Sequence, residues 1–452
     1  MRARVGRSVR AMLGAAALAG AVGLVTPRGV GADQIPAGWA ANNMEAIGYS
    51  DLDGRNGAFK MAIKEVNGRW YLYMGHLWHR GWTIVDVTDP ANPKVAKFIP
   101  GPDNTFTIQL DLHDNILLSA LQRIIPGWTD DPSKPFEEGL LIWDISDPVN
   151  PTQISHWKTG RGGTHRNSYP GGNYAYLAAG MPGFRGNIFV ILDLSDPKNP
   201  KEAGRWWMPG QKEGEAPSPV PSALHGPPVV VGNTAYIGYA PAVVILDITD
   251  KTNPKLIGRL DFSPPFILAG SQAVHSVSVV PGKPLLVANS EASAEGCDID
   301  PLNHVSVVDI EDPAKPRLMS VFPLPVPPPG APYTSFCDKG GRFGPHNPNQ
   351  HWHSPDVQQS SDLFYMTYFN AGLRIFDIRD PRQPKETGWF IPPQPTKRVG
   401  PIPVKSLVTQ TEDVLVDRRG YIYLTDKQWG LWVVRYTGPG APVPSGDQAP
   451  GH

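Results

Sequence analysis

The sequence predicts an all-β fold, a seven-bladed β-propeller, and three observations carry that prediction. A phrase of β-branched residues, an Asp and a turn that is mostly Asp-Pro recurs six times, starting at Thr83, Leu141, Val190, Val244, Ser306 and Arg374. The shared Asp occupies positions 86, 144, 193, 247, 309 and 377, so successive copies lie 58, 49, 54, 62 and 68 residues apart. GLWVVRY from Gly430 is a degraded seventh copy. A period near 50 residues built from short strands is typical of radially arranged sheets.

Each repeat divides into four strands. In the fifth they are SVSVV, PLLVAN, HVSVVDI and RLMSVF, following one another from Ser276 to Phe322. The connections alternate between tight turns on one face of the disc and long loops on the other. Binding residues gather on long loops held by a rigid scaffold, so we expect the long-loop face to be the working face. The longest insertion, Pro323–Trp352, is expected to fold over it.

The N-terminus predicts export. MRARVGRSVR is basic, the apolar run after it is too short to span a membrane, and Val30-Gly31-Ala32 resembles a cleavage site. We therefore expect a signal peptide over residues 1–32, a periplasmic or secreted location, and no membrane span in the mature chain. The propeller is assigned to residues 33–437, and the Pro/Gly-rich residues 438–452 are expected to be a disordered tail.

Composition narrows the functional class. Charged residues make up 18% of the chain and the net charge is −1, which argues against a nucleic-acid partner. The only cysteines are Cys297 and Cys337, both in long-loop segments, and an isolated pair in an exported chain predicts a disulfide. No G-x-S-x-G elbow and no phosphate-binding glycine loop after a strand is present, so nucleophilic hydrolysis has no support.

Four histidines recur at one place in the repeat, and each precedes the apolar core of the second strand by ten residues: His165, His225, His275 and His353. This offset puts each at the start of its innermost strand, on the long-loop face, so we expect the rings to converge near the axis. Imidazole is the commonest metal ligand, and a histidine cluster suits copper or iron first and zinc as an alternative. For one histidine alone, capping a strand is the better interpretation; four at one offset favour a metal site.

Other residues of that face are candidates for moving protons. Thr411 lies at the equivalent register of the last repeat, with Glu412 beside it, and Lys60 and Thr107 lie there in the first two repeats. Glu412, Lys427 and His79 are the predicted catalytic residues. Whether His76, His79 or His351 joins the metal is left open. His351 and His353 would point to opposite sides of an extended strand, one inward and one onto a neighbouring blade.

The recurring phrases, such as VILDLSDPKNP, resemble the LVIVD-repeat family over residues 60–390. That resemblance implies an exported propeller and says almost nothing about activity. RIFDIRDPRQPKETGWF is also similar to a blade of the selenium-binding proteins and the related methanethiol oxidases. This second resemblance implies copper-dependent oxidase activity resting on channel histidines.

These inferences predict an exported enzyme, a metal-dependent oxidoreductase acting on a small-molecule substrate at the long-loop face. A non-catalytic propeller that grips a protein or glycan partner is the first alternative. A metal-dependent lyase or hydrolase is the second. Bound copper or iron favours the oxidoreductase, zinc favours the lyase or hydrolase, and no metal favours the binding propeller.

Overall fold

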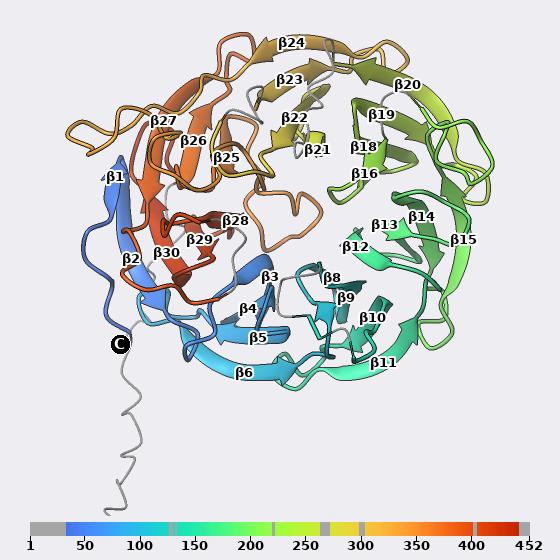
Figure 1. The fold of residues 1–452 in the computed structure, drawn as a ribbon, viewed down its shortest axis with the longest axis horizontal. Helices are drawn as coiled ribbons and strands as arrows, with labels where there is room; N and C mark the ends of the chain where they lie inside the picture. The colour runs from blue at the N-terminus through green and yellow to red at the C-terminus, as the bar shows by residue number, and fades with distance from the viewer. Residues whose placement is uncertain are drawn as a thin grey trace, which may run out of the picture. The chain divides into compact units, whose positions relative to one another are not determined.

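Antiparallel sheets surround a common axis in the computed structural model, whose inner strands face the centre of the ring (Figure 1). The structure describes residues 33–125, 130–131, 133–218, 222–262, 272–297, 303–400 and 405–442. The predicted signal peptide and residues 443–452 of the predicted tail lie outside these ranges. Ala32–His452 is one compact unit, and every named element in it is a strand. No helix of the described residues has the length and apolarity needed to cross a membrane.

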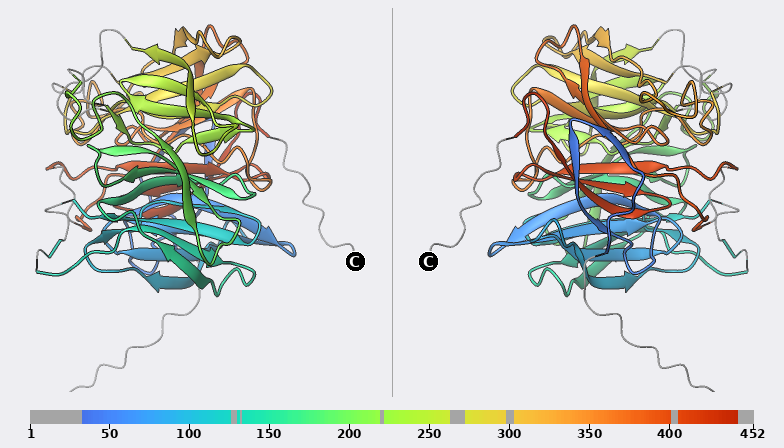
Figure 2. Two further views of the ribbon diagram at one scale, coloured as in Figure 1. Left: turned by 90° about the vertical axis from the view of Figure 1, so that its right-hand side faces the viewer. Right: turned by 90° about the vertical axis from the view of Figure 1, so that its left-hand side faces the viewer.

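The strands follow the chain around the ring, so each sheet is built mainly from consecutive elements, as the views from either side also show (Figure 2). One sheet contains β3 (Ala58–Val66), β4 (Arg69–His76), β5 (Gly81–Asp86) and β6 (Lys94–Pro100). The next contains β7 (Thr105–Phe106), β8 (Leu110–His113), β9 (Ile116–Arg123), β10 (Gly139–Asp144) and β11 (Thr152–Trp157). It continues into β12 (Gly163–Ser168), β13 (Tyr174–Gly180), β14 (Asn187–Asp193) and β15 (Lys201–Trp206). One residue pair, Gly163 with Gln122, joins β12 to β9.

The remaining sheets repeat this arrangement. One contains β16 (Ala223–Leu224), β17 (Val229–Val231), β18 (Thr234–Ala240), β19 (Ala242–Asp247) and β20 (Lys255–Asp261). Another contains β21 (Gln272–Val279), β22 (Leu285–Glu291), β23 (Val305–Asp309) and β24 (Arg317–Val321). β25 (Leu363–Thr367), β26 (Leu373–Asp377) and β27 (Lys385–Ile391) pair with β1 (Ala40–Asn42). β28 (Thr411–Val416), β29 (Tyr421–Asp426) and β30 (Gly430–Tyr436) pair with β2 (Met44–Ser50).

The N-terminal strands close the ring. β1 pairs with β27 and β2 pairs with β30, so the two ends of the propeller sequence meet in shared sheets. These N-terminal strands carry no copy of the recurring phrase, and the sequence therefore gave no register for them. Each becomes the outermost strand of a sheet whose other strands lie more than 300 residues away in sequence, which fixes the ring against opening.

The recurring phrase is a turn device. Asp86 Oδ1 accepts the N–H of Thr88 at 3.0 Å, and Asp89 Oδ1 accepts that of Ala91 at 3.1 Å. The same pair of bonds, each to the amide two residues on, recurs at the five other copies, at Asp144, Asp147, Asp193, Asp196, Asp247, Asp250, Asp309, Asp312, Asp377 and Asp380. Carboxylates in turns bond local amides in this way. The phrase sets the turn before each outer strand.

Apolar side chains fill the spaces between neighbouring sheets. Tyr176 and Phe189 of one sheet pack with Ile237 and Val244 of the next, and equivalent clusters occur around the ring. A single four-stranded sheet has two faces and cannot bury both alone. Stacking around the axis buries them, which is why the repeat specifies the whole ring.

The innermost segment before β25 differs from the predicted one. His346 N donates to Thr367 O at 2.9 Å and Asn349 N to Tyr365 O at 3.2 Å, so residues 346–349 occupy the inner position. The prediction placed His353 at the start of that strand. Residues 350–362 instead form an irregular segment between the inner position and β25, and the orange chain reaches the centre of the ring there (Figure 1).

Candidate metal centre and axial pocket

The inner strands begin with irregularities that turn extra side chains toward the axis. The pairing of β12 with β13 shifts between Thr164 and Arg166, which leaves His165 as the extra residue. Corresponding shifts occur in β3 around Lys60, in β21 before Ser276 and in β28 around Glu412. Bulges re-aim side chains and are common beside active sites. The common offset seen in the sequence therefore reflects a recurring irregularity at the start of the inner strand.

Three of the four predicted metal ligands come together. His165 Nε2 lies 2.9 Å from His225 Nε2, and the ring centres of His225 and His275 are 4.8 Å apart. Burial lowers the pKa of His165 and His275 well below its usual range, and that of His225 to about 4. Burial thus favours the neutral imidazole, which is the form that binds metals.

His346 completes the row in place of His353. Its ring centre lies 5.1 Å from that of His275, and its Nε2 lies 3.6 Å from Glu291 Oε1. Since the insertion and not the repeat supplies the inner segment of this sheet, counting back from β25 selected the wrong histidine. His346 is preceded by Gly-Pro and followed by Asn-Pro, a context without a strand signal.

Hydrogen bonds at Nδ1 direct several rings inward. His165 Nδ1 donates to Gln122 Oε1 at 2.5 Å, and His346 Nδ1 donates to the carbonyl of Glu412 at 3.0 Å. His275 Nδ1 lies 2.6 Å from Ser276 Oγ. A bond at Nδ1 selects the tautomer with a free lone pair on Nε2, which is how ligating histidines are oriented.

Glu291 lies among these Nε2 atoms. Its Oε2 is 3.3 Å from His225 Nε2 and 3.4 Å from His275 Nε2, while Oε1 accepts Arg342 Nη2 at 2.6 Å. Burial alone would raise the pKa of Glu291, but His346, His275, His225 and Arg342 together hold it well below its usual range. The carboxylate is therefore charged and fixed by the guanidinium.

The spacing of three of these atoms, His225 Nε2, His275 Nε2 and Glu291 Oε2, fits one metal ion. With bonds of about 2.1 Å, neighbouring ligand atoms lie about 3.0 Å apart at right angles and about 3.4 Å apart at the tetrahedral angle. The distances from Glu291 Oε2 to His225 Nε2 and to His275 Nε2 are 3.3 and 3.4 Å. His275 Nε2 and Glu291 Oε2 are also buried with no hydrogen-bond partner among the described residues. Such orphaned atoms need an explanation, and a shared cation supplies one.

Two predicted catalytic residues lie beside this centre. Glu412 and Lys427 form a very short ion pair, and both side chains are buried. Burial would raise the pKa of Glu412, but Lys427 and His346 hold it at about 2. Burial lowers the pKa of Lys427, and Glu412 opposes that effect.

The third, His79, lies elsewhere. Its Nε2 is 3.2 Å from Asn56 Oδ1, and it does not line the axial pocket. His76, which the sequence left open, is buried against Thr83 Oγ1 at 2.7 Å and likewise does not line the pocket.

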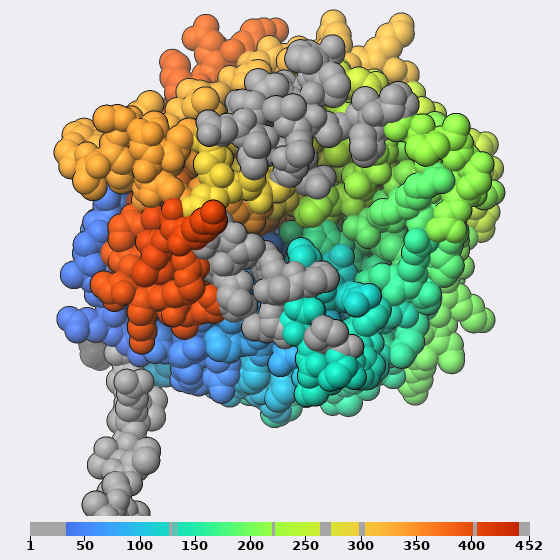
Figure 3. Space-filling model, in the orientation of Figure 1, coloured from blue at the N-terminus to red at the C-terminus, as the bar shows by residue number. Residues whose placement is uncertain are grey.

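The pocket itself has a volume of about 200 Å³ and a lining of two unlike kinds of side chain. The apolar lining residues are Phe59, Leu77, Phe106, Ile108 and Ile125. The polar lining residues are His165, Arg166, His225, Glu291, Ser293, Arg342, His346, Glu412 and Lys427. The space-filling view is hollowed near the centre of the ring (Figure 3). A small molecule lying there would have its apolar part against the apolar lining residues and a reactive part at the imidazoles.

The insertion is fastened next to the polar lining residues. Cys297 and Cys337 form the predicted disulfide, with Cα atoms 5.6 Å apart. Glu295 accepts the N–H groups of Gly341 at 3.0 Å, Ser406 at 2.9 Å and Lys405 at 2.6 Å. The insertion thereby brings Arg342 and His346 to the pocket, which agrees with the expectation that it covers the long-loop face.

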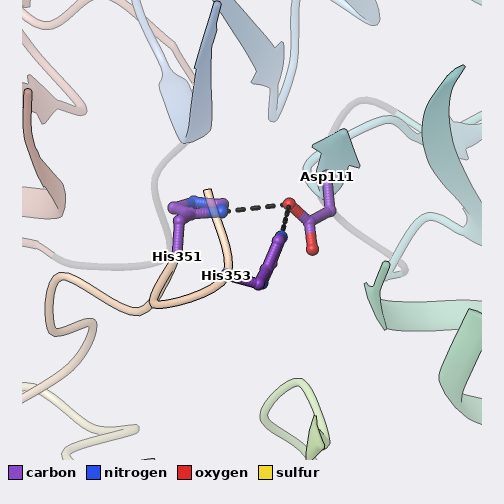
Figure 4. A group of neighbouring side chains, drawn as sticks. All are labelled: Asp111, His351 and His353. Atoms are coloured by element: carbon purple, nitrogen blue, oxygen red, sulfur yellow. Dashed lines mark hydrogen bonds and ion pairs between the residues drawn. The ribbon is translucent and has the colours of Figure 1, made fainter. Parts of the chain in front are cut away.

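A second cluster holds the remaining histidines. His353 Nε2 and His351 Nδ1 lie 3.2 and 3.0 Å from the same oxygen, Asp111 Oδ1 (Figure 4). The expectation that these rings point to opposite sides is wrong, because the segment turns at Trp352 and is not extended. His351 Nε2 and His353 Nδ1 are buried without a partner among the described residues.

This second cluster could also reach a cation, since its three ligand atoms lie within 4.8 Å of one another. The Asp111 cluster fits a cation less well than the axial centre does. Asp111 Oδ1 already lies within hydrogen-bond distance of both histidines and accepts the N–H of Leu112 at 2.9 Å, while Oδ2 accepts that of Tyr169 at 2.8 Å. The cluster lines a cavity with Asn167 and Ser168, at the end of β12, whereas His165 is near its start. The two clusters thus occupy opposite ends of the inner strands.

Sequence reasoning missed Glu291, Arg342 and His346. A signal for Glu291 existed: the strands next to the inner position end in His76, Glu291 and Asp426, all polar and all buried. Arg342 and His346 belong to the insertion, which has no counterpart in other repeats and therefore gave no register.

The family model for the LVIVD repeat matches residues 136–159, 171–207 and 229–261. The chain carries LVIVD repeats. They cover β10 and β11, β13 to β15, and β17 to β20, the strands that surround His165 and His225. The chain matches no curated protein. The likeness to selenium-binding proteins remains a prediction.

Solved structures similar to this chain are distant in sequence. The periplasmic gluconolactonase of Pseudomonas aeruginosa is 11% identical, with a TM-score of 0.50 over 79% of this chain and 96% of that one. A streptogramin B lyase is 11% identical, with a TM-score of 0.48 over 88% and 97%. A functionally unknown protein from Desulfotomaculum acetoxidans is 11% identical, with a TM-score of 0.45 over 72% and 83%. At 11% identity, the similarity to the gluconolactonase structure supports the propeller fold and nothing about activity.

Proposed function

We propose that this chain is an exported seven-bladed propeller enzyme that holds one transition-metal ion in its axial pocket and oxidises or oxygenates a small molecule. The proposed ligands are His225, His275 and Glu291, with the rings of His165 and His346 next to them. The count of seven treats the single residue pair between β9 and β12 as a link between two blades. Export is supported by the N-terminal sequence, and the disulfide is consistent with it.

One observation carries the proposal. His275 Nε2 and Glu291 Oε2 face each other at 3.4 Å, buried and without hydrogen-bond partners among the described residues, beside His225. A set of imidazoles with one carboxylate suits iron, copper or zinc, and no thiolate is available because both cysteines are bonded. A redox-active ion bound here would supply the electron transfer that oxidation requires.

The chain's own residues have separate tasks in this proposal. Arg342 holds Glu291 charged and in place. The apolar lining residues exclude water and position the substrate body. Lys427, paired with the carboxylate of Glu412, is placed to donate a proton to a group lying in the pocket, and Glu412 stabilises the lysine in its charged form.

Metal analysis tests the proposal. Protein isolated from the exported compartment should contain about one copper or iron ion per chain, and His275→Ala should lose it with a fall in affinity of about tenfold or more. His156→Ala is the matched control, because His156 lies on an outer strand and bonds the carbonyl of Glu138. Oxygen uptake would then be the activity assay.

The other outcomes are equally informative. Zinc lost in His275→Ala but not in His156→Ala would retain the site and shift the chemistry to a lyase or hydrolase. Equal metal content in wild type and His275→Ala would contradict the site. No metal in either would favour the binding propeller.

A further inference from the structure

Arg166 is a buried cation with no carboxylate partner among the described residues. It follows His165 on β12, lines the axial pocket, and has 1% of its surface exposed. Nη1 donates to Gln109 Oε1 at 3.3 Å, and its guanidinium carbon lies 4.8 Å from the ring centre of Phe59. Its Nε is buried with no hydrogen-bond partner, and no carboxylate lies within ion-pair distance, among the described residues.

The neighbouring cations differ from Arg166 in this respect. Arg342 pairs with Glu291 at 2.6 Å, Lys60 pairs with Asp413 at 2.7 Å, and Lys427 pairs with Glu412. Burying an unpaired charge is costly, and proteins normally give each such group a partner. Of the three cations that line the pocket, Arg342 and Lys427 each have a carboxylate partner, and Arg166 has none within ion-pair distance among the described residues.

The charges that line the pocket are therefore unbalanced. Arg166, Arg342 and Lys427 face two carboxylates, Glu291 and Glu412. The three cationic side chains outnumber the two carboxylates by one, and a metal cation would add to this excess. A negative group on the ligand would correct the imbalance, and a guanidinium is the side chain best shaped to hold a carboxylate through two parallel hydrogen bonds.

We propose that the ligand of the axial pocket is a small organic carboxylate, held at its charged end by Arg166. Its apolar body lies against apolar residues of the lining, Leu77, Phe106 and Ile108. The cavity of about 200 Å³ restricts the body to roughly one ring or a short chain. As a statement about substrate class this rests on the proposed function, while carboxylate binding itself does not need the metal.

Calorimetric titration tests the assignment with matched probes. Benzoate and hexanoate should bind the wild-type protein. The neutral amides benzamide and hexanamide should bind at least about tenfold more weakly. Arg166→Gln should lose the preference for the carboxylates, and Arg166→Lys should keep part of it because the charge remains but the fork is lost. Arg161→Gln is the control, since Arg161 pairs with Glu213 outside the pocket.

Metal content separates this inference from the proposed function. Arg166→Gln with wild-type metal content and lost carboxylate preference supports both. Carboxylate binding that depends on Arg166 in a protein that holds no metal supports this inference and removes the proposed function. Equal affinity for carboxylate and amide, no binding of either carboxylate at millimolar concentration, or unchanged benzoate binding in Arg166→Gln and Arg166→Lys would overturn the inference.

Discussion

The two ends of the inner strands carry similar side chains with different connections. At the pocket end, His165 and His346 each donate Nδ1 to a partner of their own, and their Nε2 atoms face a shared space. At the other end, His351 and His353 both direct a nitrogen at one oxygen of Asp111. The carboxylate oxygen at the pocket end, Glu291 Oε2, has no hydrogen-bond partner among the described residues, whereas Asp111 Oδ1 is shared by two histidines and the N–H of Leu112. Residue type alone does not identify a metal site; the hydrogen bonds that the ligand atoms already make do.

The largest expected effect on stability comes from the buried ion pair between Lys60 and Asp413, which lies between the two clusters. Lys60 lines the cavity of the Asp111 cluster and pairs with Asp413, which follows Glu412 in the chain. Asp413→Ala leaves the Lys60 ammonium buried and unpaired and removes the acceptor of the Met61 N–H. We expect a loss of about 3–5 kcal/mol in the free energy of unfolding, measured by urea denaturation.

The double variant Lys60→Met/Asp413→Asn controls for this change, because it removes both charges and keeps an oxygen for Met61. It should recover most of the lost stability. A loss below about 1 kcal/mol in Asp413→Ala would show that Lys60 reaches another partner, and the two ends would then be less independent than the contacts indicate.

Removing the disulfide should have the next largest effect, and it should act on the pocket end of the inner strands. Cys297 and Cys337 are 40 residues apart, and Arg342 and His346 follow on the tethered insertion. Cys297→Ser/Cys337→Ser should cost about 2–4 kcal/mol of stability. It should also weaken metal binding, measured by competition with a chelator. Lost stability with unchanged metal affinity would mean that the Glu295 bonds alone position the insertion.

Gly226→Ala acts on the pocket end alone. A Cβ at Gly226 would lie 2.2 Å from His275 O and 2.6 Å from Ser276 Oγ, so His225 and His275 would have to move apart. We expect a cost of about 1–3 kcal/mol and weaker metal binding. Gly162→Ala is the control, because nothing lies within 4 Å of its added Cβ. Equal metal affinity in the two variants would argue that His225 is not a ligand.

The sequence predicted those parts of the site that belong to the repeat and missed those that do not. The repeated phrase predicted the sheets, and the common offset found His165, His225 and His275, because inner strands start with a similar irregularity. The offset failed at His353, where 13 residues of irregular chain separate the inner segment from β25. The disulfide was predicted from cysteine count and loop position. Ring closure by β1 and β2, the carboxylate of Glu291 and the unpaired charge of Arg166 depend on contacts between distant segments that no periodicity encodes.

The smallest expected effect is a change in pH dependence at the Asp111 end. Burial alone would raise the pKa of Asp111, but His353 and His351 lower it far below its usual range. A carboxyl group with a depressed folded pKa stabilises the protein above its unfolded pKa of about 3.9, and that contribution is lost as the pH falls toward the folded value. Between about pH 5 and pH 3, the stability of wild type should therefore fall more steeply than that of Asp111→Asn, by at most about 1.4 kcal/mol per pH unit.

Metal content decides what the Asp111 result means. If the second cluster only holds residues 350–362 in place, Asp111→Asn changes the slope of unfolding free energy against pH and leaves the bound metal unchanged. Equal slopes in wild type and variant would show that the two histidines do not keep the carboxylate charged. Loss of a metal ion in Asp111→Asn would show that both ends bind cations. The contrast between them would then lie in affinity, because Asp111 Oδ1 must release its present hydrogen bonds to become a ligand.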